Sequence, residues 1–322
     1  MEALKVIQPG AFTTVQDLGR YGYQKYGVSI SGAMDRFALR VANLLVGNWE
    51  GEAAIEATVV GPKLKAFRDL QLAFTGADLS PEVNGKATPM WCTLSIHEGD
   101  VISYGVPQSG CRAYMALSGG IDSPLVMGSR SIHTRSNLGG KGRALIKGDV
   151  LKVKGPERQP SDRKTANQLP RDQIPTYGRD WQIRVVLGPQ NDYFTRHGID
   201  TFLTSEYIIT PQADRMGYRL KGLPIEHKRG ADILTDATPP GSIQVPGDGM
   251  PIILLADGQT TGGYSKIAVV TSTDQDLLAQ ARPGDRVRFQ RVTITEAHRL
   301  LREMEEKIQK IKNSLIPTNP PK

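Results

Sequence analysis

A run of polar residues and glycines at 257–266 carries the clearest chemistry in the sequence. It reads Asp-Gly-Gln-Thr-Thr-Gly-Gly-Tyr-Ser-Lys and follows an apolar strand pattern at 251–256. Glycines let a backbone approach a ligand closely and turn its N–H groups toward an anion, and Lys266 adds a positive charge. We therefore predict that this loop binds a carboxylate, a phosphate or a carbonyl oxygen that becomes negative as it reacts, with a structural turn as the alternative. Its predicted ligand contacts are Gln259, Thr260, Thr261, Gly262, Gly263 and Tyr264.

Two positions before this loop can add to the same site. Gln244 stands in a short strand pattern that is otherwise apolar, where a carboxamide needs partners and can both donate to and accept from a ligand amide. Arg215 lies in the turn Asp214-Arg-Met-Gly217, and its guanidinium can bind a carboxylate with two parallel hydrogen bonds. A salt-bridge network between Asp214 and Arg215 is the alternative.

A second polar group lies near the N-terminus. Gln16, Asp17 and Arg20 follow a predicted strand and precede Tyr21-Gly22, which is more polar chemistry than a plain hairpin needs. Asp35 stands near the start of a predicted helix and can cap it instead of joining a site. These four residues form a candidate second site.

Several common kinds of site are absent from the sequence. There is no G-x-x-x-x-G-K-[ST] phosphate loop and no G-x-S-x-G nucleophile elbow. The five histidines never fall at metal-ligand spacing, and the two cysteines, Cys92 and Cys111, cannot build a disulfide scaffold or a Cys-rich zinc site. We therefore expect no bound metal.

The positive charge is concentrated in one part of the chain. Lys and Arg number 40 against 33 Asp and Glu, but residues 130–171 hold eleven of the bases and three of the acids. A solvated linker explains this stretch, a docking surface for an acidic partner is the alternative, and nucleic acid is disfavoured because no aromatic residues interleave the charges. No apolar run approaches the roughly 20 residues of a membrane span, so we expect a cytoplasmic protein that contacts no membrane.

Short strand patterns separated by turn residues predict a mainly β fold. A Gly-Asp pair followed by an alternating strand pattern recurs at 99–104, 148–153 and 284–289, which is typical of β-barrels. The opening of the chain also resembles residues 183–186, so two related β-rich halves are the simplest prediction. The expected division is an N-terminal barrel domain at 1–155, a basic linker at 156–178, a C-terminal barrel domain at 179–293, and a helix with a tail at 294–322.

Two helices are expected. One follows Ser31 and ends near Gly47, and the other opens at 293–296 with a capping-box pattern. The second helix carries an apolar seam that can pack on its own barrel or pair with a second copy of the chain. This seam consists of Ala297, Leu301, Met304, Ile308, Ile311 and Leu315.

Seven sequence blocks together resemble one protein family. They are Thr13–Arg20, Gly32–Asp35, Gly76–Asp78, Gly119–Asp122, Ala213–Gly217, Gly241–Pro246 and Gln259–Tyr264. In this order they are similar to the allophanate-hydrolase-subunit-2 family. The family includes the carboxyltransferase domain of urea carboxylase, the C subunit of prokaryotic 5-oxoprolinase and a bacterial antagonist of a sporulation-kinase inhibitor. The resemblance spans nearly all of residues 4–290. The chain departs from the pattern at Gly258, where Arg is usual, and at Ser265, where Pro is usual.

The resemblance implies two cyclophilin-like β-barrels and a leading function. That function is opening of the lactam of 5-oxo-L-proline to L-glutamate with ATP, together with the 5-oxoprolinase subunits A and B, the latter resembling the kinase inhibitor. ATP would be bound with or by a partner subunit. Lys266 would then contact the oxyanion or phosphate, Arg215 the substrate carboxylate and Gln244 the lactam amide. Asp257 or Asp214 would be the general base.

Two other functions stay open at this point. The chain carries no Ala-Met-Lys-Met biotinylation motif, so a carboxyltransferase would take carboxybiotin from another protein and act on an amide or urea. The third function is regulatory, a binding protein that antagonises a histidine-kinase inhibitor. The basic stretch and the C-terminal helix would then make the contact.

Overall fold

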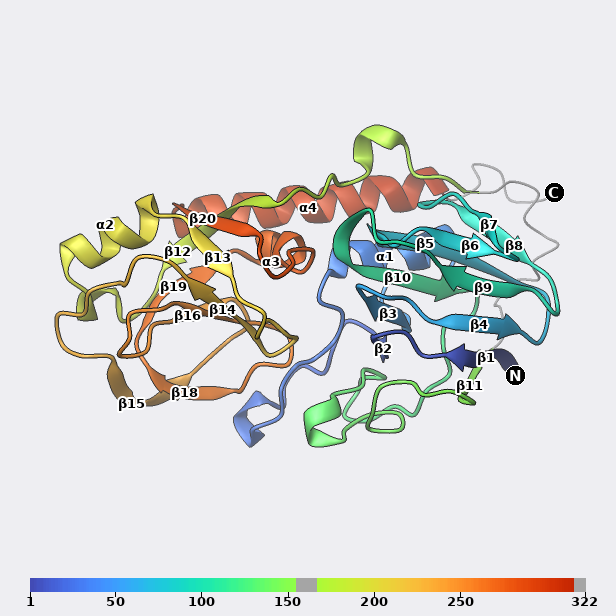
Figure 1. The fold of residues 1–322 in the computed structure, drawn as a ribbon, viewed down its shortest axis with the longest axis horizontal. Helices are drawn as coiled ribbons and strands as arrows, with labels where there is room; N and C mark the ends of the chain where they lie inside the picture. The colour runs from blue at the N-terminus through green and yellow to red at the C-terminus, as the bar shows by residue number, and fades with distance from the viewer. Residues whose placement is uncertain (155–166, 316–322) are drawn as a thin grey trace. The chain divides into compact units, whose positions relative to one another are not determined.

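The protein is described by a computed structural model that covers residues 1–154 and 167–315 (Figure 1). Residues 156–166 of the basic linker predicted at 156–178, and the tail after 315, lie outside these residues. The chain divides into two compact units. Unit 1 comprises Met1–Gly19, Asp35–Tyr177 and Glu305–Lys322, and unit 2 comprises Arg20–Met34 and Gly178–Met304. The units are therefore not the contiguous segments expected from the sequence, because 20–34 groups with the second half and the end of the last helix with the first.

Unit 1 contains two antiparallel sheets in the described part of the chain. One has the order β11-β1-β4-β9-β6-β7, with β1 Glu2–Gln8, β4 Lys63–Ala66, β6 Pro81–Val83, β7 Lys86–Ala87, β9 Val101–Tyr104 and β11 Val150–Lys152. The other has the order β2-β3-β10-β5-β8, with β2 Phe12–Gln16, β3 Ala54–Thr58, β5 Leu70–Asp78, β8 Thr93–Ile96 and β10 Ser109–Leu117. One large apolar core takes side chains from both sheets, including Leu4, Leu64, Ile55, Phe74 and Met115.

Helix α1, Arg36–Leu45, packs against β5 and β10 of unit 1. Asp35 is its N-cap, since its Oδ1 accepts a 2.8 Å hydrogen bond from the Ala38 N–H. Gly47 follows the C-cap with φ 74°, a left-handed conformation that glycine adopts without strain. The predicted end of this helix is confirmed, and the capping alternative for Asp35 is the one observed.

Unit 2 is built around a closed seven-stranded barrel of order β12-β19-β16-β17-β14-β13-β20. Its strands are β12 Asp180–Leu187, β13 Tyr207–Ile209, β14 Gly217–Lys221, β16 Ser242–Gln244, β17 Ile252–Leu254, β19 Lys266–Val270 and β20 Arg286–Arg291. A separate two-stranded ribbon pairs β15 Asp232–Ala237 with β18 Thr261–Tyr264. The mainly β fold is confirmed, with a closed barrel in unit 2 and a pair of sheets in unit 1.

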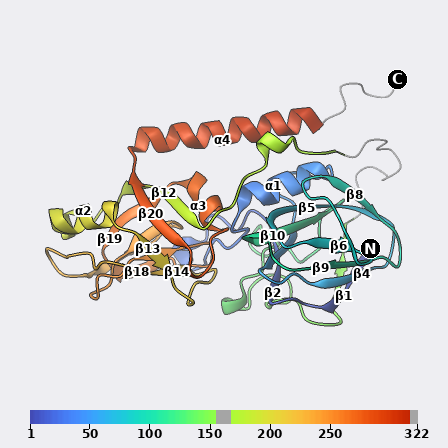
Figure 2. The same cartoon turned by 45° about the horizontal axis from the view of Figure 1, so that its top comes forward.

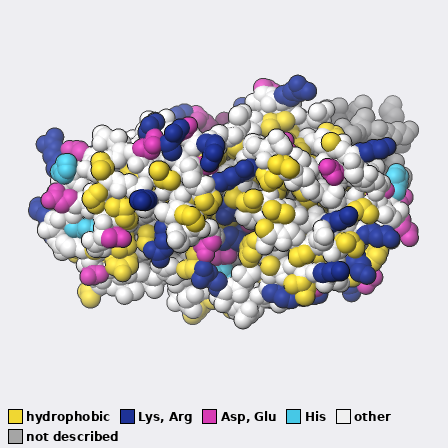
Figure 3. Space-filling view, in the orientation of Figure 1, with side chains coloured by type: hydrophobic (Ala, Val, Ile, Leu, Met, Phe, Trp, Pro, Cys, Tyr) yellow, Lys and Arg dark blue, Asp and Glu magenta, His cyan; other side chains and the backbone are white. Residues whose placement is uncertain are grey.

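The remaining helices are short apart from the last one. They are η1 Gln24–Tyr26, η2 Thr134–Ser136, η4 Arg171–Gln173, η5 Asn191–Tyr193, α2 Arg196–Thr204, α3 Ser272–Leu278 and α4 Ile294–Leu315. In the described part of the chain, none of the helices is long and apolar enough to span a membrane. Lys and Arg side chains lie interspersed with apolar and acidic ones on the face seen in Figure 3.

The three Gly-Asp pairs form the same local structure. In each, the aspartate accepts a hydrogen bond from the N–H three residues earlier, at 2.8 Å for Asp100, 2.9 Å for Asp149 and 2.9 Å for Asp285. The preceding glycine has φ of 90°, 91° and 87°, respectively, which a residue with a Cβ rarely adopts. Strands β9, β11 and β20 start directly after these turns, so the predicted repeat is confirmed as a turn that launches a strand.

Helix α4 is one continuous helix in both ribbon views (Figures 1 and 2). Ile308 and Ile311 of its predicted seam are buried within the single chain, whereas Leu301 is 38% exposed. Near them, Glu305 forms two hydrogen bonds to the Arg40 guanidinium at 2.6 and 2.7 Å. These contacts favour packing of this end of α4 on its own chain over pairing of the seam with a second copy.

Candidate active site

Two predicted site residues face each other at one end of the barrel. Gln244 is the last residue of β16 and Lys266 the first of β19, and they are partners in the antiparallel register. The register shifts between Ile243 and Gln244, but both side chains are buried and both reach the β15–β18 ribbon. Lys266 Nζ contacts Asp236, and Gly262, which pairs with Asp236, lies against Gln244 Nε2. The amide group and the ammonium group thereby meet the same paired position of the ribbon, Gly262 opposite Asp236.

The Gln244 carboxamide is only weakly held. Its Nε2 donates to the Tyr264 carbonyl at 3.4 Å, and its Oε1 accepts from Gln259 Nε2, also at 3.4 Å. Hydrogen bonds between nitrogen and oxygen usually measure 2.7–3.2 Å, so both contacts are long. A ligand amide can replace them at small cost, because the protein loses little when they break.

The Lys266 ammonium is paired with a carboxylate that the sequence analysis did not select. Its Nζ lies 2.9 Å from Asp236 Oδ2. Gln190 Nε2 donates to the same oxygen at 3.2 Å, and Gln190 Oε1 accepts from the Lys266 backbone N–H at 3.3 Å. Hydrogen bonding to the ammonium lowers the pKa of Asp236 below its usual value, so this carboxylate is ionised at neutral pH.

The glycines of the 257–266 loop act differently from the prediction. Gly258, Gly262 and Gly263 do not have the positive φ of an anion-binding nest, and residues 261–264 form strand β18. The prediction that the glycines turn their N–H groups toward an anion is therefore wrong, and at 261–264 the reason is that pairing with β15 keeps the backbone extended. Gly262 instead gives space: a Cβ there would lie 2.4 Å from Gln244 Nε2.

The threonines and the tyrosine of the loop contribute less to the candidate site than Gln244 and Lys266 do. The Gln259 carbonyl accepts from Thr238 Oγ1 at 2.5 Å, and the Thr260 carbonyl accepts from the Thr238 N–H at 2.9 Å. Thr261 opposes Ala237 in the ribbon. Tyr264 is exposed and contributes its carbonyl to Gln244. These contacts join the loop to the ribbon.

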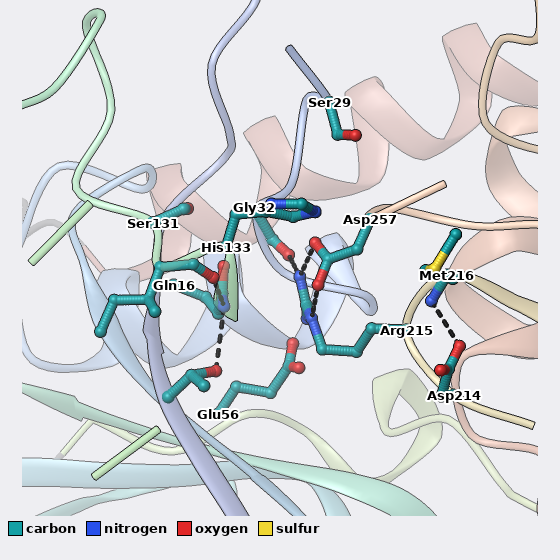
Figure 4. Close-up of polar contacts among 12 residues, drawn as sticks. Gln16, Ser29, Gly32, Glu56, Ser131, His133, Asp214, Arg215, Met216 and Asp257 are labelled. Atoms are coloured by element: carbon teal, nitrogen blue, oxygen red, sulfur yellow. Dashed lines mark hydrogen bonds and ion pairs between the residues drawn. The ribbon is translucent and has the colours of Figure 1, made fainter. Parts of the chain in front are cut away.

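Arg215 and Asp257 form a buried ion pair with each other (Figure 4). Arg215 Nε and Nη2 lie 2.8 and 2.9 Å from the two Asp257 oxygens, and Nη2 also donates to the Gly32 carbonyl at 2.7 Å. This two-pronged contact is the one that a substrate carboxylate would need. The geometry therefore speaks against Arg215 as the carboxylate-binding residue and against Asp257 as the general base.

Asp214 is also engaged in local structure. Its Oδ1 accepts from the backbone N–H of Met216 at 2.7 Å and of Gly217 at 3.3 Å, which closes the turn before β14 (Figure 4). Arg215 forms its buried ion pair with Asp257, 42 residues away in sequence. A carboxylate that holds a turn in this way is a poor candidate for a base.

The strand register separates the two groups of site residues. Gln244 is opposite Ile252 at the start of β17, whereas Gly217, two residues after Arg215, is opposite Leu254 at its end. Arg215 and Asp257 therefore lie beyond the other end of β17 from Gln244 and Lys266. The prediction that all of them line one pocket is not supported.

Gln16 and Asp17 of the candidate second site make hydrogen bonds to other residues of unit 1. Gln16 Nε2 donates to Thr14 Oγ1 and to the Ile132 carbonyl, both at 2.9 Å. Asp17 accepts from the hydroxyls of Ser129 and Ser131 at 2.7 and 2.5 Å. These contacts fix strand β2 to the loop at 129–132, a structural task.

The other two residues of this candidate site belong to different units. Asp35 caps α1 in unit 1, whereas Arg20 belongs to unit 2, where its backbone N–H donates to the Ile30 carbonyl at 2.8 Å. The Arg20 side chain is one of the largest fully buried side chains of the protein.

Unit 1 holds a buried polar group that the sequence analysis missed. Glu56 of β3 and Tyr114 of β10 are opposite each other, and the Tyr114 hydroxyl donates to Glu56 Oε2 at 2.6 Å. The Asp35 N–H donates to the same hydroxyl at 2.8 Å. Burial, followed by the negative charges of Glu56 and Asp35, raises the pKa of Tyr114 well above its usual value. The available signal was a glutamate between the apolar residues Ile55 and Ala57 of the strand Ala54–Thr58.

Comparison with known proteins agrees with this architecture. Residues 26–291 match the model of the carboxyltransferase domain, subdomain A and B. The chain belongs to this family. Among its relatives, the C subunit of 5-oxoprolinase from Escherichia coli is 37% identical over 91% of this chain and 93% of its own length.

Family members from yeasts are longer proteins. Urea amidolyase of Saccharomyces cerevisiae is 33% identical over 94% of this chain but only 17% of its own length. The crystal structure of the K. lactis urea amidolyase matches with a TM-score of 0.89 at 32% identity, over 96% of this chain and 20% of that one. The carboxyltransferase family is thus represented both in 5-oxoprolinase and in urea-processing enzymes.

Proposed function

We propose that this chain is part of an ATP-dependent 5-oxoprolinase that works with subunits A and B. The observation that carries the proposal is the match to the C subunit of 5-oxoprolinase, which extends over nine-tenths of both chains. A second C subunit of 5-oxoprolinase, from Haemophilus influenzae, is 35% identical over 93% of this chain and 94% of its own length. Of the two partners, the B subunit would be the one that resembles the kinase inhibitor.

The site at Gln244 and Lys266 suits the chemistry of this reaction. A lactam is a poor electrophile, so ATP would phosphorylate its oxygen before water adds to the carbon, phosphate leaves and the C–N bond opens. Gln244 can pair with a lactam, which offers one N–H and one C=O, because a carboxamide offers the same two groups. Lys266 supplies a positive charge for an anionic group, on a side chain that is itself buried. ATP would be bound with or by a partner subunit.

The second candidate is carboxyl transfer from a biotin carried by another protein to an amide or urea. The similarity to the urea amidolyase structure favours it. A urea resembles a lactam in its planar N–C=O group, so the same carboxamide can bind either substrate.

One assay separates the two candidates. The chain is mixed with subunits A and B, and glutamate is measured after addition of 5-oxo-L-proline and ATP. We expect glutamate only when all three proteins and ATP are present. In a second mixture, the chain is combined with a biotin carrier, a biotin carboxylase, ATP, bicarbonate and urea. If no glutamate forms in the first mixture, and the second one carboxylates urea in a reaction that avidin blocks, the proposal is wrong and the second candidate is correct.

A further inference from the structure

The ion pair between Lys266 and Asp236 is unequal in its exposure to solvent. The Lys266 side chain is 3% exposed, whereas that of Asp236 is 48% exposed. The ammonium is thus a fixed part of the barrel end, while its counter-ion reaches it from the solvent side. Such a pair differs from a fully buried one, because water or a ligand can approach the carboxylate.

Asp236 lies on the least supported strand of unit 2. Strand β15 is exposed at every position except a half-buried Ile233, and Leu234 is 95% exposed. Among the strands of the described residues it pairs with β18 alone, in a two-stranded ribbon whose register is irregular between Asp232 and Asp236. Segments with few buried apolar contacts and solvent-exposed backbone hydrogen bonds open at low cost in free energy. The ribbon can therefore move Asp236 away from Lys266 while the barrel stays folded.

Loss of Asp236 would leave Lys266 as a buried ammonium without this counter-ion, which is strongly unfavourable. An anion that arrives as Asp236 leaves removes this penalty. The position is also prepared for a carboxylate: Gln190 Nε2 donates to the same Asp236 oxygen that the ammonium contacts, so two donors converge on it.

We infer that Lys266 and Gln190 form a carboxylate-binding site that Asp236 fills in the resting protein and that the substrate's carboxylate takes over. If the proposed function holds, that carboxylate belongs to 5-oxo-L-proline, whose lactam then faces the neighbouring Gln244. This assigns to Lys266 the carboxylate contact that the sequence suggested for Arg215. Asp236 acts as a competitor that keeps the site neutral until a carboxylate enters.

The test measures binding by calorimetry on the full chain, without ATP or partner subunits. Three ligands are compared: 5-oxo-L-proline, acetate, which is a carboxylate without a lactam, and 2-pyrrolidone, which is a lactam without a carboxylate. In the variant Asp236→Asn the internal competitor is gone, so both carboxylates should bind about fivefold more tightly than to the wild type, as expected for loss of a partly exposed ion pair. Binding of 2-pyrrolidone should not change.

A matched control is Asp232→Asn, which removes the same charge from the same strand at a residue whose backbone pairs with Tyr264. It should leave all three affinities unchanged, and Lys266→Met should abolish the gain when combined with Asp236→Asn. Unchanged or weaker carboxylate binding in Asp236→Asn, or an equal gain in Asp232→Asn, would overturn the inference. Acetate binding tests the inference even if the assembled complex makes no glutamate. A failure of the inference can therefore be distinguished from a failure of the proposed function.

Discussion

Gln244 and Lys266 are cross-strand partners in the barrel, yet their polar groups are held with different strength. The carboxamide makes two hydrogen bonds of 3.4 Å, whereas the ammonium has a 2.9 Å ion pair with Asp236. A neutral amide partner can thus be exchanged easily, while an anionic one must be replaced by another anion. This difference is the basis for placing an amide and a carboxylate of one substrate at this barrel end.

The space at Gly262 should be needed for substrate binding. In Gly262→Ala the new Cβ would come within 2.4 Å of Gln244 Nε2, so the flexible carboxamide must turn away. We expect the KM for 5-oxo-L-proline to rise about tenfold, the effect of losing one good hydrogen bond, while the thermal midpoint changes little. Gly263→Ala is the matched control, because its Cβ would meet Ile233 O at an ordinary 3.7 Å. Equal KM values for the two variants would contradict the role of Gln244.

The Arg215–Asp257 pair should act through stability. Asp257→Asn removes a negative charge from beside a buried guanidinium and should lower the free energy of unfolding by about 3 kcal/mol. The exposed pair Arg286–Asp180 provides the control, since Asp180→Asn should change stability little. Urea unfolding measures both. An Asp257→Asn protein that unfolds like the wild type but has lost all turnover would instead restore Asp257 as a catalytic base.

Acid should destabilise unit 1 partly through Asp149. Hydrogen bonds from Arg143, followed by Lys141 and the Ile146 N–H, hold the pKa of Asp149 well below its usual value. A carboxylate with a lowered pKa in the folded state stabilises the protein above its unfolded pKa of about 4, and this contribution is lost as the pH falls below that value.

The variant Asp149→Asn tests this directly. Its melting temperature should lie below that of the wild type at pH 7, and the gap should narrow as the pH falls below about 4. The exposed change Glu98→Gln should produce no such gap. A constant difference between Asp149→Asn and wild type from pH 7 down to about pH 2 would show that the charge of Asp149 is not what matters.

The features that were predictable from sequence are local ones. The Gly-Asp turns close over four residues, from the hydrogen-bonded N–H to the aspartate, so residue type alone determines them. The cap and the end of α1 are equally local, at Asp35 and Gly47. The family was predicted from the seven sequence blocks and the order in which they follow one another.

The features that were missed depend on strand register and long-range pairing. Asp236 contacts Lys266 across 30 residues, and Arg215 pairs with Asp257 across 42 residues. Gly262 and Gly263 were interpreted as part of an anion-binding loop, but pairing of β18 with β15 makes the backbone at 261–264 extended. A one-residue change of register reverses which face a side chain lies on, and composition does not reveal it.

The most direct measurement of the central claim is glutamate formation by the complex assembled with Lys266→Met. The chain with Lys221→Met, which removes an exposed ammonium from β14 of the same barrel, is measured beside it. We predict that Lys266→Met abolishes ATP-dependent glutamate formation from 5-oxo-L-proline and that Lys221→Met retains the wild-type rate. A wild-type rate with Lys266→Met would show that the site at Gln244 and Lys266 does not carry the reaction.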